Sequence, residues 1–412
     1  MHNKLYNIIF LIAFIIMFFL SCMAPFAKPY DKMVQNLLQI YLSGDFKRAY
    51  QKADDLVSEI KSYQKQDYYL SLLERGKIAL AIGDYKGAIY DLQRAEKRFL
   101  KIENTISTNE EAGALFTNDL GKEYITDPHE MLFISPYLAL AYLMSGDFAS
   151  ARVERNRTIN KINRYIEKSG KRHLENAFSR FISALIYEME EKFDDVKIEY
   201  RKMAKSYKYL KHFKNKNIKK QSTSLVVILD IGLAPYKYEI KYGPSQVMIG
   251  DNWVTVAFAY AGMAPSPRET KNCTIFIDNK KQKSKLLYNV ERTIMQHYNK
   301  TKKRQLQVIL KRVIAKLATS YGIQSLGNYL GRDYDVPFRG IGRELSNIMA
   351  DMEKADLRNW STLPRKIHYS RFDNLESGSS VVQIEYTGGV IEKKVNIRKD
   401  QINLLYVVVP GY

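Results

Sequence analysis

The sequence predicts an α+β multidomain protein, in which an N-terminal α-helical array precedes an α+β domain with a mostly antiparallel sheet. Three observations predict this order: a turn sequence recurs before residue 204, strand-like runs begin at residue 225, and strand-like runs return after residue 365. A chain of 412 residues with 46% hydrophobic residues is long enough for two to three domains with real cores. We expect helical repeats over residues 31–213, a basic linker over 214–224 and the α+β domain over 225–412.

A glycine–aspartate–aromatic turn recurs in the first half of the chain, and each copy has alanine three residues after the aromatic residue. Glycine ends one helix in a left-handed conformation, aspartate caps the next helix, and alanine lets the two helices approach closely. A degenerate fourth copy contains Phe193 and Val196. The full copies give the predicted repeat-turn residues, which are Gly44, Phe46 and Ala49, Gly83, Tyr85 and Ala88, and Gly146, Phe148 and Ala151.

These turns resemble those of tetratricopeptide (TPR) repeats. The resemblance implies helix pairs that stack into a curved array, whose concave face binds peptide segments of a partner. The alternative is an array that only packs on the C-terminal domain and supports it.

The first residues predict export from the cytoplasm. An apolar run over residues 8–20 follows Lys4, and at roughly 1.5 Å per residue a helix of this length is too short to cross a bilayer. A basic start, a short apolar core and a small residue before cysteine are typical of a signal peptide. Residues 19–22 resemble the lipobox of bacterial lipoproteins, which implies cleavage after residue 21 and a lipid on Cys22. An uncleaved signal anchor is the alternative.

The predicted location is the cell envelope, facing the periplasm, with residues 1–21 as the lipoprotein signal peptide and residues 22–30 as the tether. Met23 stands where aspartate would resemble an inner-membrane signal, so we expect the outer membrane. Several acyl chains on Cys22 would anchor the protein stably. We therefore expect protein partners in the envelope and no nucleic acid partner, despite the basic charge.

The excess positive charge lies in the middle of the chain. The net charge is +20, and residues 201–350 hold 28 basic against 9 acidic residues, whereas residues 1–200 hold 27 of each. In an anchored protein, this segment is a candidate contact for anionic lipid headgroups. A solvated linker and helix face explain the same charge.

The C-terminal half changes from strands to helices and back. Apolar and β-branched runs predict strands over residues 225–229, 253–260 and 273–277. Helical spacing predicts helices over 287–298, over 306–321 (a second helix or a continuation) and over 342–355. Strand patterns return over 366–372, 381–386, 390–397 and 402–409.

Residues 356–364 follow the pattern D-x-R-x-W-x-x-L-P. With the lipobox and the repeats, this motif resembles a family of uncharacterised bacterial lipoproteins with TPR-like repeats, which implies this domain organisation and no particular reaction. In the structural interpretation, Asp356 and Arg358 pair across a helix end and Trp360 fills the sheet. In the functional one, Trp360 and Arg358 form a platform for a peptide or glycan, with Arg358 binding a carboxylate.

The sequence carries no motif for a reaction, a metal or a cofactor. The six histidines lack the i, i+4 spacing of a helical metal site, and no HExxH, CxxC, GxSxG or Walker motif occurs. We expect no catalytic residue and no cofactor, although dispersed catalytic residues remain open. The leading hypothesis is a non-catalytic scaffold that binds proteins in the envelope. The alternatives are an enzyme or small-ligand protein, or a lipoprotein that delivers ligands to a transporter; the candidate binding residues are Asp356, Arg358, Trp360 and Arg339, near Gly342.

Overall fold

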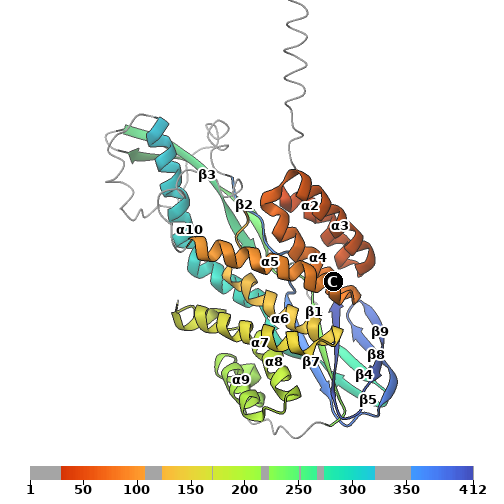
Figure 1. Cartoon of the computed structure of the whole chain (residues 1–412). Helices are drawn as coiled ribbons and strands as arrows, with labels where there is room; N and C mark the ends of the chain where they lie inside the picture. Colours follow the sequence, from red (N-terminus) through yellow and green to blue (C-terminus); the bar gives the residue numbers. More distant parts are fainter. Residues whose placement is uncertain are drawn as a thin grey trace, which may run out of the picture.

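The computed structural model describes residues 29–106, 123–168, 170–214, 222–249, 252–266, 273–320 and 354–411. The predicted signal peptide, Cys22, Arg339 and Gly342 lie outside the described residues. Within them the α+β class is confirmed, since helices fill the N-terminal half and strands most of the C-terminal half (Figure 1).

Helices α2 to α9 stack in chain order, from the top to the bottom of Figure 1, and each packs against the next. Helices α4, α6 and α8 form an inner row that is buried on nearly every side, whereas α3, α5, α7 and α9 bury one face. The α-helices are α2 (Tyr30–Leu42), α3 (Phe46–Tyr63), α4 (Tyr68–Ile82), α5 (Tyr85–Ile106), α6 (Pro128–Ser145), α7 (Phe148–Asn163), α8 (Ala177–Met189) and α9 (Phe193–Ser206). Short helical turns are η1 (Lys65–Asp67), η3 (Arg164–Lys168), η4 (Arg172–Leu174) and η5 (Lys208–Phe213).

The recurring turns share one geometry. Each turn glycine has a left-handed φ of 84° or 85°, and each turn aspartate accepts a backbone N–H three residues further on at 3.0 or 3.1 Å. The alanine after each turn is fully buried. In the first copy, Phe46 packs edge-on against Tyr41, with 5.1 Å between ring centroids. In the degenerate copy, Glu191 takes the left-handed conformation, with φ of 58°.

The strands form three sheets rather than one. The first has the order β10-β1-β7-β6, the second β2-β3 and the third β5-β4-β8-β9. Their pairs are antiparallel except β1 with β10, which is parallel, so a mostly antiparallel arrangement is confirmed. The strands are β1 (Ser224–Ile231), β2 (Tyr236–Ile249), β3 (Asn252–Ala264), β4 (Thr274–Ile277), β5 (Lys280–Lys283), β6 (Lys285–Asn289), β7 (Lys366–Phe372), β8 (Gly378–Tyr386), β9 (Gly389–Ile397) and β10 (Ile402–Val409).

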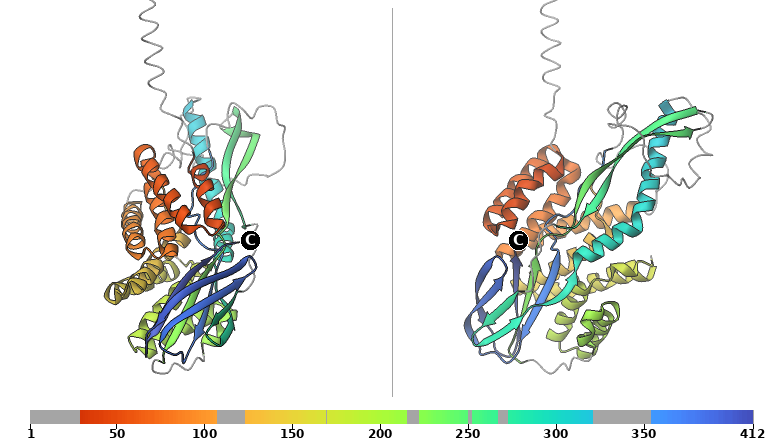
Figure 2. Two further views of the ribbon diagram at one scale, coloured as in Figure 1. Left: turned by 90° about the vertical axis from the view of Figure 1, so that its right-hand side faces the viewer. Right: turned by 180° about the vertical axis from the view of Figure 1, so that it is seen from behind.

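Strand β1 belongs to the middle one of three layers, which are the inner helices, the β10-β1-β7-β6 sheet and the β5-β4-β8-β9 sheet. Its side chains alternate between two cores. Val226 and Ile228 pack in the same core as the inner helices, whereas Leu225, Val227 and Leu229 pack against the β5-β4-β8-β9 sheet. Figure 2 shows the β10-β1-β7-β6 sheet and the β5-β4-β8-β9 sheet on the same side of the helix stack. One hydrophobic core therefore continues from the helices into the C-terminal half, across the boundary expected at residues 214–224.

Strands β2 and β3 form a long ribbon that extends from the body, and helix α10 (Val290–Ser320) packs against β3 (Figure 2). Strand β2 was not predicted, although residues 236–242 alternate aromatic or apolar with charged residues, because they form no continuous apolar run. The predicted helix start at Leu287 is wrong, since this residue is in β6 and α10 begins at Val290. Residues 306–320 continue α10 as one helix. No helix in the described ranges is long and apolar enough to span a bilayer.

Candidate functional site

Residues 356–364, here called the strap, run from beside α6 to the start of β7. Arg358 holds the start of the strap: its Nε donates to Asp356 Oδ1 at 2.9 Å, and its Nη1 donates to Asp67 Oδ1 in η1 at 2.7 Å. The predicted pairing of Asp356 with Arg358 is therefore present, without a helix at this point of the chain.

Two carboxylates of the inner helices bind the backbone of the strap. The N–H of Trp360 donates to Glu130 at 2.7 Å, and the N–H groups of Ser361 and Thr362 donate to Glu74 at 2.7 and 2.9 Å. Burial raises the pKa of Glu74 to about 7, although these hydrogen bonds act in the opposite direction. Burial, and then the charge of Asp127, raises the pKa of Glu130 to about 7.

The structure contradicts the interpretation of Trp360 and Arg358 as an exposed platform. Trp360 is 0% exposed and packs edge-on against Tyr137, with 6.1 Å between ring centroids. Arg358 is 3% exposed, and the carboxylates that it binds belong to the same chain. Both side chains hold the strap on the helices, because a buried indole and a buried guanidinium need internal partners.

A pocket of about 460 Å³ lies beside the strap, between the N-terminal end of α6, strand β3 and helix α10. Of the motif residues, Asp356 lines this pocket, whereas Arg358 and Trp360 lie behind the wall. Aromatic and apolar side chains make much of the lining, and lysines lie among them. The lining includes Tyr124, Tyr260, Tyr298, Met263, Ile294 and Leu306, with Lys171, Lys302 and Lys354.

Histidines from three separate elements lie together here, and two of them, His129 and His297, line the pocket. His129 comes from α6, His173 from η4 and His297 from α10. The rings of His173 and His297 stack, with Nε2 of the first 3.0 Å from Nδ1 of the second, and the centroids of His129 and His297 are 5.8 Å apart. Burial lowers the pKa of His129 to about 4 and that of His173 to about 4, so both rings are neutral at pH 7.

An ion pair lies next to the histidines. Lys237 Nζ from β2 is 3.4 Å from Asp127 Oδ2 and donates to the Arg358 carbonyl at 2.8 Å. Burial alone would raise the pKa of Asp127, but the charge of Lys237, followed by those of the nearby histidines, lowers it to about 2. Asp127 is therefore ionised across the physiological pH range.

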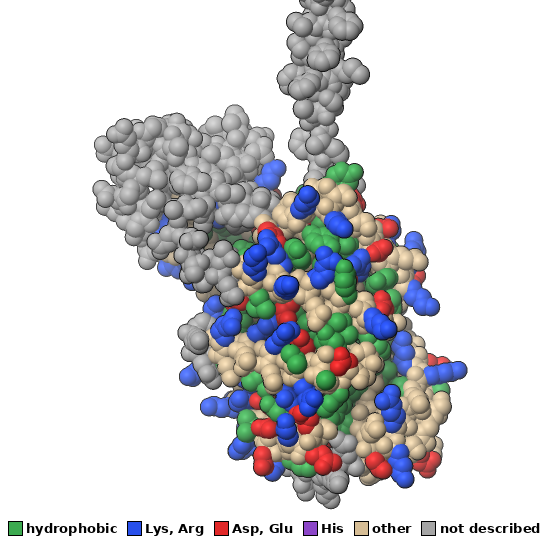
Figure 3. All heavy atoms as spheres, in the orientation of Figure 1, with side chains coloured by type: hydrophobic (Ala, Val, Ile, Leu, Met, Phe, Trp, Pro, Cys, Tyr) green, Lys and Arg blue, Asp and Glu red, His purple; other side chains and the backbone are tan. Residues whose placement is uncertain are grey.

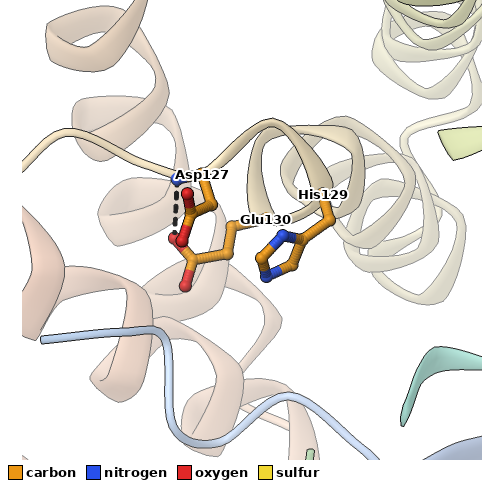
Figure 4. A group of neighbouring side chains, drawn as sticks. All are labelled: Asp127, His129 and Glu130. Atoms are coloured by element: carbon orange, nitrogen blue, oxygen red, sulfur yellow. Dashed lines mark hydrogen bonds between the residues drawn. The ribbon is translucent and has the colours of Figure 1, made fainter. Parts of the chain in front are cut away.

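Asp127, His129 and Glu130 form a group of metal-ligand type, with one ligand atom from each within 4.8 Å of the others. Figure 4 shows the three side chains at the start of α6, where the Asp127 N–H donates to Glu130 at 3.2 Å. His129 Nδ1 is buried and has no hydrogen-bond partner among the described residues. This group was not predicted from the sequence, because its spacing is not that of a known metal motif.

A second buried polar group joins the helices to the sheet away from the pocket. Lys77 of α4 is fully buried and lies 2.6 Å from Asp230 of β1. The hydroxyls of Tyr137 and Tyr406 each donate to the same Asp230 oxygen at 2.7 Å. A single aspartate in an otherwise apolar buried strand was a signal for such a partner, but the sequence could not identify Lys77.

No protein-family model matches this chain, and no curated protein sequence matches it either. The functional inference therefore depends on the pocket and on the sequence signals.

Proposed function

We propose that this protein is an exported, lipid-anchored protein of the bacterial cell envelope that binds a small organic ligand in the pocket between α6, β3 and α10. The observation that carries this proposal is the convergence of polar groups from separate elements on one pocket of about 460 Å³. A pocket with apolar walls and a few fixed polar groups is typical of small-ligand sites.

The proposal retains the TPR-like repeats as the support of the pocket. The recurring left-handed glycines, capping aspartates and buried alanines favour this assignment of α2 to α9. Helix α6 presents His129 to the pocket, and α5, α7 and α8 pack against this helix and hold it in place.

A groove that binds partner proteins is less well supported than the pocket. The inner helices α4, α6 and α8 share a core with β1 and β10, so this chain itself covers their inner surface. Large exposed apolar side chains are spread over the outer helices, as Tyr63, Tyr90, Val153 and Ile198. Basic, acidic and apolar side chains are mixed on the face of the helices that Figure 3 shows.

The pocket is tested with a substitution that fills it. Ala261→Trp places an indole at the pocket wall, and Ala149→Trp on the exposed surface of α7 is the matched control. We expect native mass spectrometry of the full chain, purified from envelopes in detergent, to find a bound small molecule in the wild type and in the control. Loss from Ala261→Trp alone supports the pocket. No retained molecule, together with no thermal shift from a panel of amino acids, sugars, carboxylates and phosphates, contradicts it.

The anchor is tested separately. Cys22→Ala should abolish labelling of the protein with palmitate and prevent cleavage of the signal peptide. Cys273→Ala, at the other cysteine, should leave labelling unchanged. Labelling that persists in Cys22→Ala would exclude lipidation at this residue.

A further inference from the structure

The start of α6 has the donor atoms of a cation site, and two of the three residues concerned, Asp127 and His129, line the pocket. A carboxylate oxygen of Asp127, a ring nitrogen of His129 and a carboxylate oxygen of Glu130 all lie within 4.8 Å of one another (Figure 4). A zinc ion bonds such atoms at about 2.0–2.2 Å, so its ligand atoms lie up to about 4 Å apart. The observed spacing of up to 4.8 Å exceeds this limit by about 1 Å or less.

The His129 ring supplies an independent observation. This side chain is 6% exposed, and its buried Nδ1 has no hydrogen-bond partner among the described residues. An unpaired buried polar atom costs about 1–3 kcal/mol, so native structures nearly always provide a partner for it. In Figure 4 the ring lies on the same side of α6 as the two carboxylates. A cation between them would accept the lone pair of this ring.

We propose that Asp127, His129 and Glu130 bind a divalent late transition metal ion, such as Zn²⁺, at the start of α6 beside the pocket. One imidazole with carboxylates suits zinc and its neighbours, whereas Mg²⁺ and Ca²⁺ favour ligand sets of oxygen alone. The inference goes beyond the proposed function, because the ion can bind whether or not an organic ligand is present.

Glu130 limits how many bonds the protein supplies. Its carboxylate already accepts hydrogen bonds from Trp360 N–H, Tyr124 O–H and Asp127 N–H. A carboxylate accepts about four hydrogen bonds, so one position remains for a metal. Three protein ligands leave at least one position of the ion open toward the pocket, as in metal sites that bind an exchangeable molecule.

His297 and His173 support this site from α10 and η4. The hydrogen bond between His297 Nδ1 and His173 Nε2 fixes the orientation of the His297 ring beside His129. The edge-on contact with His297 limits rotation of the His129 ring and so keeps it in place for binding.

Lys237 competes with the metal for Asp127. Its ammonium lies 3.4 Å from Asp127 Oδ2, so a bound cation must displace this ion pair or share the carboxylate with it. Removal of the ammonium should therefore strengthen metal binding, an effect that a purely structural role of Asp127 does not produce.

The experiment is calorimetric titration of Zn²⁺ into the full chain, purified in detergent without a polyhistidine tag and stripped with a chelator. We expect one saturable site, a loss of at least about tenfold in affinity for His129→Gln, and unchanged affinity for His212→Gln, an exposed histidine beside Tyr369. Lys237→Gln should bind Zn²⁺ more tightly than the wild type. Mg²⁺ should not bind this site.

Absence of saturable Zn²⁺ binding overturns the inference, and so does equal affinity in His129→Gln and the wild type. If His129→Gln fails to fold, the comparison of Lys237→Gln with the wild type decides, and unchanged or weaker binding there is the contrary result. The two proposals can fail separately. If Ala261→Trp loses a co-purified molecule but the wild type shows no Zn²⁺ site, the proposed pocket function stands and only the metal site is rejected.

Discussion

At the scale of single residues, buried charges determine how the helices meet the sheet. Lys77 is fully buried, and burial lowers its pKa while the Asp230 charge acts in the opposite direction. An ammonium in such a position is tolerated only when a carboxylate and further hydrogen bonds surround it. Tyr137 of α6 and Tyr406 of β10 supply these further hydrogen bonds, since both hydroxyls donate to Asp230.

We expect Lys77→Met to lower the free energy of unfolding by about 3–5 kcal/mol, because it leaves the Asp230 carboxylate buried without its cation. Urea denaturation measures the change. The double variant Lys77→Met/Asp230→Leu should recover part of the loss, whereas Lys52→Met, in an exposed ion pair with Asp55, should change little. A double variant less stable than Lys77→Met would contradict this reasoning, because it would show that Tyr137 and Tyr406 satisfy the Asp230 carboxylate without the cation.

His368 makes stability depend on pH. Burial lowers the pKa of His368 to about 4, whereas the unfolded chain has a histidine pKa of about 6.5. Between these values the unfolded state binds more protons, so stability falls as the pH falls from about 6.5 to about 4. Urea midpoints across this range should vary less in His368→Gln than in the wild type, and as much in His212→Gln as in the wild type. Equal slopes in all three proteins would contradict this assignment.

At the scale of elements, each recurring turn depends on a glycine that only a few residues can replace. A Cβ added at Gly146 meets no atom within 4 Å, so its left-handed φ of 85° is the main obstacle to substitution. We expect Gly146→Ala to cost about 1–2 kcal/mol in thermal or urea unfolding. Ser145→Ala, at the preceding helical residue, should cost clearly less. Similar losses in both variants would point to a cause other than the glycine conformation.

The strap should depend on both oxygens of Glu74, because each accepts a backbone N–H. Glu74→Gln places an amide NH₂ against one of these donors, at an expected cost of about 1–3 kcal/mol. Hydrogen exchange of residues 356–364 should accelerate in this variant. Exchange should stay unchanged in Glu59→Gln, the same substitution at an exposed position of α3. Unchanged exchange in Glu74→Gln would show that the Glu74 carboxylate does not hold the strap in place.

Most elements with a repeating pattern were predicted, and one was missed. Strand β1 and strands β7 to β10 lie where apolar runs or alternation placed them, within a few residues. Strand β2 was missed although residues 236–242 alternate aromatic or apolar with charged residues, a pattern typical of a strand that is buried on one face. The pairing of Asp356 with Arg358 was predicted from spacing, whereas Asp67, Glu74 and Glu130 lie more than 200 residues away in the chain.

At the scale of the whole molecule, the two predicted domains share a core. The side of β1 that carries Val226 and Ile228 packs with the inner helices, so neither half buries its apolar surface alone. We expect one cooperative transition for the full chain, with the same midpoint by far-ultraviolet circular dichroism, which reports the helices, and by near-ultraviolet circular dichroism, which reports aromatic packing. Two separated transitions would show that the halves fold independently.

The sequence alone determined the α+β class, the order of helices before strands and the turn residues of the array, since each depends on residues near one another in the chain. The tertiary structure decided which surface of the array is free, what the strap motif does and where the histidines meet. His129, His173 and His297 come from elements far apart in sequence, and no local pattern encodes their proximity. Helix α10 contacts both α6 and η4 and so brings them together, because Ile294 of α10 is buried in the same apolar core as α6.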